Sequence, residues 1–164
     1  MQRYAIRVSG DDLSFAAAHF ITFDDGSVEP LHGHTYFVGA EVELPLGPAS
    51  YTIDFTVVRR LLGEAVRPMD HRLLLPGKHP NLAIDRRGDE IEVRFGPRRW
   101  IFPAEDCLVL PLANTTAEAL AGHVAELLRA GLEAEAARRP VRLRVELEEA
   151  RGCRAVFEWA APET

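Results

Sequence analysis

Apolar residues recur with a helical period in only two segments of this chain, and this limits the possible folds more than any other feature. The first segment begins at Phe55, continues at steps of three and four residues, and stops near Pro68. The second begins at Thr115, where Thr115-x-x-Glu118 fits a capping box, and is predicted to stop at residues 138–140. Most of the remaining chain must therefore fold as strands and connecting loops.

Several of the remaining segments have the β-branched and aromatic content of strands. They cover residues 3–9, 13–22, 34–44, 141–149 and 154–159. Only a short turn separates the last two, which predicts an antiparallel pair, and such pairs packed against two helices make an α+β domain. Because 164 residues with 47% apolar content can form one sizeable core, we expect a single domain over residues 1–164.

Residues 76–112 form a distinct region between the two predicted helices. Short strand-like pieces at 91–95 and 99–102 are separated by Gly96-Pro97, which predicts an elaborated hairpin. The Arg98-Arg99 pair beside this turn is an available contact for an anion.

The composition argues against several classes of function. A formal charge of -6, a pI near 5.5 and the lack of any Lys/Arg-rich run argue against nucleic-acid binding. No run approaches the ~18 apolar residues of a membrane span, and the first residues lack the apolar core of a signal peptide. Cys107 and Cys153 do not suffice for a disulfide framework and lack zinc-knuckle spacing. We therefore expect a cytoplasmic protein that does not bind membranes.

Three histidines can converge on one metal ion. His32 and His34, in the stretch LHGHTY, project from the same face if a strand begins there. His19 lies in the preceding strand-like stretch, FAAAHF, and a loop over residues 20–31 could bring that strand back antiparallel beside the pair. Three neutral imidazoles with an open fourth position are typical of a catalytic zinc site.

Two other interpretations of the histidine pair need consideration. A pair at the start of a strand is also compatible with a hydrogen-bonded surface feature that binds no metal. A cupin-type metal site is excluded, because Val38 and Gly39 stand where that site needs a glutamate.

Taken with other motifs in the same order, these residues resemble the 6-pyruvoyltetrahydropterin synthase and 6-carboxytetrahydropterin synthase family. The motifs extend from Phe15 to Phe157. They are FxAAH, HGH, an Asp-His after the first predicted helix, Thr-Ala-Glu at the start of the second predicted helix, and a glutamate in the penultimate strand. The resemblance implies the tunnelling fold (T-fold), an antiparallel sheet with two helices on one face. It also implies a homo-oligomer, commonly a hexamer built as a dimer of trimers, in which strands of neighbouring subunits close a β-barrel.

The resemblance implies zinc bound by His19, His32 and His34, and it gives further residues a role. Asp70 and His71 resemble the family's acid–base pair, in which the carboxylate orients the imidazole and the imidazole moves a proton on the substrate. The alternative is an Asp-His at a helix exit that has no part in chemistry.

A substrate site is implied by residues in the second half of the chain. Glu149 is in step with the apolar residues of its strand, so its carboxylate faces inward and needs partners, which a pterin's ring N–H and amino group supply as two parallel donors. Glu148 takes its place if the register differs by one residue. Thr115 and Thr116 resemble contacts to the pterin edge, and Glu118 is assigned either to the substrate or to the helix cap alone.

The chain departs from the family at its catalytic thiol. Members that make the pyruvoyl or carboxy product carry a cysteine at the position of Val28. The next residue, Glu29, gives the motif ExxHGH, which resembles a subgroup in which glutamate replaces that cysteine and the side chain is cleaved to give 6-hydroxymethyl-7,8-dihydropterin for folate synthesis. Neither Cys107 nor Cys153 matches the missing position.

These features favour a zinc-dependent carbon–carbon or carbon–oxygen lyase that acts on 7,8-dihydroneopterin triphosphate. Glu29, Asp70 and His71 are its candidate catalytic residues. Two alternatives stay open. One is a 6-carboxy- or 6-pyruvoyl-tetrahydropterin synthase that works without the usual thiol, as in queuosine biosynthesis, and the other is a non-catalytic relative that binds zinc and pterin.

Overall fold

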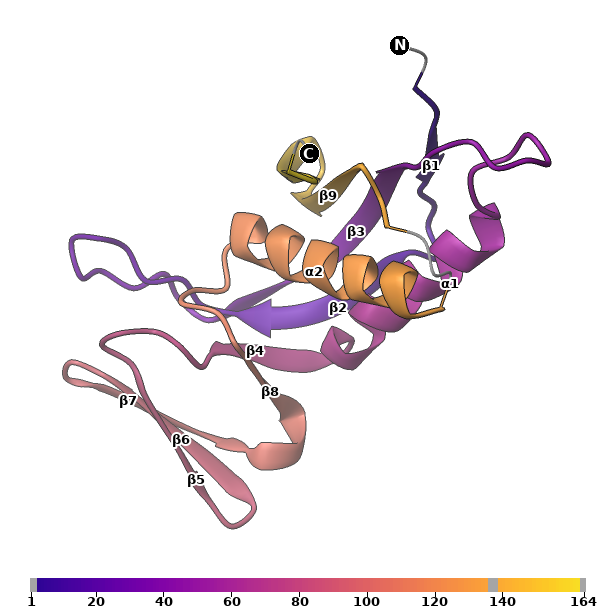
Figure 1. Cartoon of the computed structure of the whole chain (residues 1–164). Helices are drawn as coiled ribbons and strands as arrows, with labels where there is room; N and C mark the ends of the chain where they lie inside the picture. Colours follow the sequence, from indigo (N-terminus) through magenta and orange to yellow (C-terminus); the bar gives the residue numbers. More distant parts are fainter. Residues whose placement is uncertain (1–2, 136–138, 163–164) are drawn as a thin grey trace.

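The computed structural model describes residues 3–135 and 139–162, which form a mixed β-sheet with two helices on one face (Figure 1). The strands of the larger sheet are β1 (Ala5–Val8), β2 (Ser14–His19), β3 (His32–Glu43), β4 (Arg72–Pro76), β8 (Cys107–Leu110), β9 (Arg142–Ala150) and β10 (Cys153–Ala160). Their order in the described part of the chain is β10-β9-β3-β2-β4-β8, and β1 also pairs with β3. Each predicted strand outside residues 76–112 is confirmed, and β3 begins early enough to include His32.

Helix α1 (Phe55–Val66) confirms the first predicted helix. Its N-cap is Asp54, whose side chain accepts a hydrogen bond from the backbone N–H of Thr56 at 2.7 Å. The helix is followed by a short 3₁₀ turn, η1 (Arg67–Met69). Pro68 lies in this turn and has no N–H with which to continue an α-helix.

Helix α2 (Ala117–Glu135) confirms the second predicted helix, although its cap differs from the predicted one. The hydroxyl of Thr116 accepts a hydrogen bond from a backbone N–H of the first turn at 3.3 Å. The capping box of Thr115 and Glu118 is therefore wrong by one residue, because the Thr115 hydroxyl is directed into the protein. The predicted stop includes Arg138, which lies outside the described residues. No helix in the described ranges has the length and apolar character needed to cross a membrane.

Strands β4 and β8 make the predicted antiparallel sheet a mixed one. Strand β4 runs parallel to β2, with Ala17 opposite Arg72, and β8 runs parallel to β4. The other pairs of the larger sheet, within the described residues, are antiparallel. The sequence does not predict these two strands, because parallel neighbours are not joined by a short turn and their pairing depends on tertiary contacts.

The region between β4 and β8 forms a separate sheet of three strands, seen at the lower left of Figure 1. It consists of β5 (Ala83–Arg87), β6 (Glu90–Phe95) and β7 (Arg98–Pro103), and a 3₁₀ turn, η2 (Ala104–Asp106), leads from it into β8. The predicted hairpin of β6 and β7 is thus extended by one further strand. The buried side chains of Ile91 and Val93 join a small core with Leu75 of the larger sheet and with Phe20, which directly follows β2.

The main core lies between the larger sheet and the two helices. The predicted shared face of Phe15, Ala17 and His19 is confirmed, since all three are buried there. Phe15 stacks on Tyr36 of the neighbouring strand, with ring centroids 4.8 Å apart. The last residues of this buried face therefore lie where β2 ends and β3 begins, and this is where the histidines gather.

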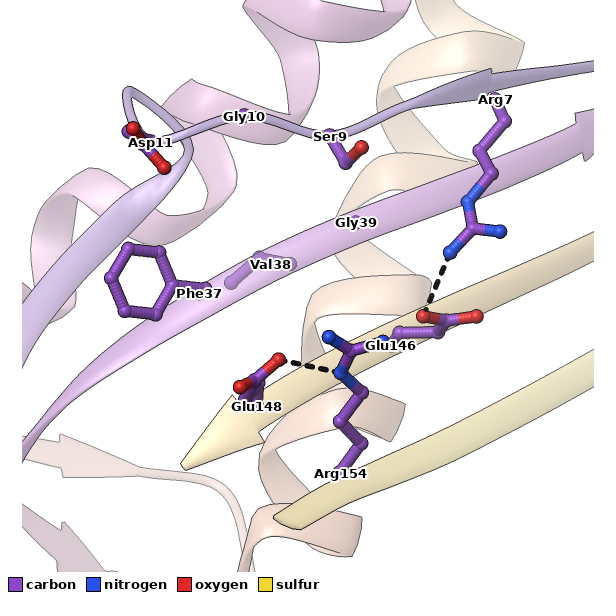
Figure 2. A pocket seen from close by; sticks show the side chains of 10 residues that line it. All are labelled: Arg7, Ser9, Gly10, Asp11, Phe37, Val38, Gly39, Glu146, Glu148 and Arg154. Carbon is purple, nitrogen blue, oxygen red and sulfur yellow. Dashed lines mark hydrogen bonds and ion pairs between the residues drawn. The ribbon is translucent and has the colours of Figure 1, made fainter. Parts of the chain in front are cut away.

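The opposite face of the sheet carries charged side chains. Arg7 pairs with Glu146 at 3.0 Å, and Arg154 pairs with Glu148, across a shallow pocket that also includes Gly39 (Figure 2). Opposite charges on neighbouring strands stabilise a sheet face that can remain in contact with water.

Candidate metal centre and substrate pocket

His19, His32 and His34 lie together at the paired ends of β2 and β3. The antiparallel register places His19 opposite His32 and Ala17 opposite His34. Ring centroids are 4.7 Å apart for His19 and His32, 4.7 Å for His32 and His34, and 5.3 Å for His19 and His34. Each imidazole offers one nitrogen within 4.8 Å of the other two, so the predicted trio forms one group that could hold a metal ion.

Backbone carbonyls set the orientation of two of these imidazoles. Nδ1 of His19 is 2.8 Å from the carbonyl oxygen of Thr115, and Nδ1 of His32 is 2.7 Å from that of Pro30. A carbonyl only accepts hydrogen bonds, so each Nδ1 carries a hydrogen, and in the neutral ring Nε2 keeps its lone pair. Burial lowers the pKa of His19, which favours the neutral form that a metal requires. The residues present therefore fit a zinc ion.

Glu149, at the end of β9, lies beside this group. Its Oε1 is 3.4 Å from Nε2 of His19 and 3.7 Å from Nε2 of His34. Glu148 points to the opposite face, where a backbone N–H of the following turn and Arg154 lower the pKa of its carboxyl. Of the two glutamates considered from the sequence, only Glu149 is near the histidines.

Tyr36 is a residue of this site that the sequence analysis does not identify. Its hydroxyl donates to Oε1 of Glu149 at 3.1 Å and is 3.2 Å from Nε2 of His19. Burial, followed by the charge of Glu149, raises the pKa of the phenol far above its usual range, so the hydroxyl keeps its proton. The alternation that relates His32 to His34 also places Tyr36 on this face, and that signal was available in the sequence.

Glu29 reaches the histidines from the loop between β2 and β3. Its backbone N–H donates to the carbonyl of Ile21 at 2.8 Å, which closes the loop. Its Oε1 is 3.9 Å from Nε2 of His32, near the metal group but beyond hydrogen-bond distance. Val28, at the position of the family's thiol, packs against the small core instead.

Asp70 and His71 form a pair between η1 and β4. Nδ1 of His71 is 3.0 Å from Asp70, and the backbone N–H of Ala16 donates to the same carboxylate at 2.9 Å. This bond from Ala16 is the main cause of the lowered pKa of Asp70. His71 shares an open hollow with His34, but no hydrogen bond or ion pair joins the pair to the three histidines within the described residues.

A pocket of about 670 Å³ lies next to the metal group, between the N-terminus of α2 and the β2–β3 loop. Three of the predicted substrate-binding residues line it: Thr116, Glu118 and Glu149. Cys153 also lines it, whereas the thiol of Cys107 donates to a backbone carbonyl of the small sheet.

Thr115 does not line this pocket. It is fully buried, its hydroxyl donates to the carbonyl of Phe20 at 3.1 Å, and its own carbonyl accepts from His19. Asn114 fixes it further, because its side chain accepts from the Thr115 N–H at 3.0 Å and donates to the carbonyl of Thr22 at 2.8 Å. In this chain Thr115 orients an imidazole of the candidate metal site.

Fold and site together define a class of proteins. In this class, three histidines at the paired ends of two strands can hold a metal ion, and a carboxylate lines the neighbouring pocket. The model of the 6-pyruvoyl tetrahydropterin synthase family matches residues 10–160, and the chain belongs to this family.

Two archaeal relatives are provisionally named 6-carboxy-5,6,7,8-tetrahydropterin synthase. The protein of Methanocaldococcus jannaschii is 30% identical over 114 residues, which cover 69% of this chain and 69% of the relative. The protein of Pyrococcus horikoshii is 29% identical over 108 residues, which cover 65% of this chain and 64% of the relative.

Among solved structures, 6-pyruvoyl tetrahydropterin synthase of Plasmodium vivax superposes with a TM-score of 0.90 over 98% of this chain and 100% of that one, at 24% identity. Two further structures of the Plasmodium vivax protein carry alanine or cysteine in place of a glutamate described as a catalytic residue. The likeness confirms the T-fold of a single subunit.

Proposed function

We propose that this protein is a zinc-dependent lyase that converts 7,8-dihydroneopterin triphosphate to 6-hydroxymethyl-7,8-dihydropterin, for folate synthesis. The observation that carries the proposal is the placement of Glu29, whose carboxylate lies 3.9 Å from the metal-facing nitrogen of His32 while Val28 occupies the family's thiol position. The catalytic glutamate of the Plasmodium vivax relative supports the same assignment.

The three imidazoles would hold the zinc ion, with Nε2 of His19 and of His32 as two of its ligands. When bound, zinc supplies Lewis-acid chemistry to the hydroxyl groups of the substrate side chain. The carbonyls of Thr115 and Pro30 keep the two rings in the ligand orientation before the ion arrives.

Glu29 is the proposed proton acceptor for the substrate side chain. A carboxylate is a weaker base than a thiolate, and we assign it to removal of the proton from a side-chain hydroxyl, after which the adjacent carbon–carbon bond can cleave. Two hydrogen bonds hold its loop, one from the Glu29 N–H to the carbonyl of Ile21 and one from the Asn114 side chain to the carbonyl of Thr22. They limit the region that the Glu29 carboxylate can reach.

Glu149 is the proposed anchor of the pterin ring, with Thr116 and Glu118 at the rim of the same pocket. A carboxylate that faces two parallel N–H donors binds both of them, and this geometry fixes the ring in its plane.

Asp70 and His71 have a proposed catalytic role only in a homo-oligomer, which we expect to be a hexamer. In the described residues the pair makes no hydrogen bond or ion pair with the histidines of its own chain, and 83% of the His71 side chain is exposed. A neighbouring subunit that covers this surface would bring the imidazole to a second active site as a proton-transfer group.

The direct test is the product. Purified zinc-loaded protein is incubated with 7,8-dihydroneopterin triphosphate, and the pterins formed are identified by mass spectrometry. We expect 6-hydroxymethyl-7,8-dihydropterin and the two-carbon aldehyde, carrying the triphosphate, that is released with it. Bound substrate without any turnover would contradict the proposal and identify a non-catalytic pterin-binding relative.

One observation favours a second candidate, a 6-carboxy- or 6-pyruvoyl-tetrahydropterin synthase. Cys153 lines the substrate pocket with Glu149 and can supply the thiol that Val28 does not. A 6-carboxy or 6-pyruvoyl product, lost in Cys153→Ser and kept in Cys107→Ser, would support this candidate against the lyase.

A further inference from the structure

The hydroxyl of Tyr36 lies at a fixed point between the metal group and the proposed pterin anchor. Tyr36 follows His34 by two residues on β3 and is fully buried. Its ring stacks on Phe15 at a centroid distance of 4.8 Å and an interplanar angle of 18°. Both residues belong to paired strands of the main core, so the ring has little freedom to move.

Glu149 has no comparable constraint of its own. It is the next-to-last residue of β9, and its side chain is 24% exposed. Among the described residues, the Tyr36 hydroxyl is the only donor that makes a hydrogen bond to its carboxylate. The neighbouring Nε2 atoms of His19 and His34 lie 3.4 and 3.7 Å from this carboxylate, and neither makes a hydrogen bond to it in the described structure.

We infer that Tyr36 is a positioning residue, whose hydroxyl holds the Glu149 carboxylate at a set distance from the metal histidines and so sets the place of the pterin ring relative to the metal. This inference rests on the proposed function, in which Glu149 anchors the ring. A carboxylate that is already oriented loses less conformational freedom when the ligand binds, and ligand affinity rises accordingly.

The test is Tyr36→Phe, which keeps the ring and its stacking on Phe15 and removes only the hydroxyl. In zinc-loaded protein, a fluorescence titration with 7,8-dihydroneopterin measures the dissociation constant, and elemental analysis measures the zinc content. We expect the dissociation constant to rise roughly tenfold, since a hydrogen bond to a charged group is lost, and zinc per chain to stay unchanged. Tyr51→Phe, at an exposed tyrosine, is the matched control and should bind as wild type.

A double-variant cycle separates positioning from packing. If Tyr36 acts through Glu149, Tyr36→Phe combined with Glu149→Gln should bind no more weakly than Glu149→Gln alone. KM should rise in Tyr36→Phe with a smaller change in kcat.

Four results would overturn the inference. They are wild-type affinity in Tyr36→Phe, fully additive losses in the double variant, a fall in kcat at unchanged affinity, and loss of zinc. Glu149→Gln on its own shows where a failure lies. If this variant binds the pterin as wild type does, the assignment of Glu149 as the anchor is wrong. If Glu149→Gln weakens binding and Tyr36→Phe does not, Glu149 remains the anchor and the positioning role of Tyr36 is wrong.

Discussion

Two carboxylates on strands of this protein, Glu92 and Glu149, have opposite surroundings. The Glu92 side chain is 4% exposed on β6 and is bound by guanidinium groups of Arg94 and Arg99, with Arg87 at 3.8 Å. The Glu149 side chain is 24% exposed and has imidazoles and a phenol around it, with no arginine or lysine bonded to it in the described ranges.

This difference separates a structural carboxylate from one that can bind a ligand. Arg99 donates to Glu92 at 2.6 and 2.9 Å, and Arg94 also donates to it, so both of its oxygens are occupied. Within the part of the chain that the structure describes, Glu149 receives one hydrogen bond and keeps acceptor capacity toward an open pocket. Arg99, an anion contact expected from the sequence, thus already directs its Nε and Nη2 donors to Glu92.

The largest expected effect comes from removing an imidazole beside Glu149. His32→Ala should abolish both zinc binding and turnover, because two imidazoles make a poor zinc site. Elemental analysis and product formation measure the two losses. His123→Ala, on α2, is the control and should keep about one zinc per chain. A wild-type protein that stays free of metal in zinc-containing buffer would contradict the metal centre altogether.

The next largest effect concerns the other carboxylate near the histidines. Glu29→Ala should lower the rate by roughly 10² to 10⁴, as expected for a lost acid–base group, and leave the zinc content unchanged. Asp25→Ala, in the same loop, is the control. Turnover of Glu29→Ala at the wild-type rate would make Glu29 an ordinary loop residue.

Val28→Cys adds a thiol beside Glu29 and tests whether the residue type in this loop decides the product. Because a thiolate is the family's base at this position, the variant should shift the product toward the pyruvoyl or carboxy compound. Mass spectrometry of the reaction mixture measures the ratio of products. An unchanged ratio would show that a side chain at position 28 does not reach the substrate.

A smaller effect is expected when only the charge of Glu149 is changed. Glu149→Gln should weaken pterin binding by roughly 10- to 100-fold and keep the zinc, because an amide cannot accept from both ring donors. Glu148→Gln provides a matched control on the opposite face of the same strand. Equal losses in the two variants would argue against a specific anchor, and a fluorescence titration distinguishes them.

The metal group was predictable because its geometry is local. His32 and His34 are related by strand alternation, and the loop over residues 20–31 leaves an antiparallel return as the simplest connection. Thr115 was not predictable in the same way, since adjacent threonines offered two possible cap positions and the buried carbonyl of Phe20 decided between them. Nor could the partners of Glu92 be predicted, because they come from three different strands.

The final prediction concerns Glu92, where we expect an effect on stability alone. The guanidinium groups of Arg99 and Arg94 lower the pKa of Glu92 from 4.5 to about 2. A depressed folded-state pKa contributes stability that is fully present above pH 4.5 and is lost as the pH falls toward 2. Glu92→Gln should therefore lower the Tm at pH 7 by several degrees and reduce the acid dependence of the Tm over that interval.

Thermal unfolding monitored between pH 7 and pH 2 measures this effect, with Glu90→Gln as the control because Glu90 is exposed on the same strand. Zinc content and pterin affinity of Glu92→Gln at pH 7 should equal those of wild type, since none of the hydrogen bonds to Glu92 comes from a residue of the metal group or the substrate pocket. A loss of pterin affinity in this variant would show that the small sheet acts on the substrate pocket, and the contrast between the two carboxylates would then no longer hold.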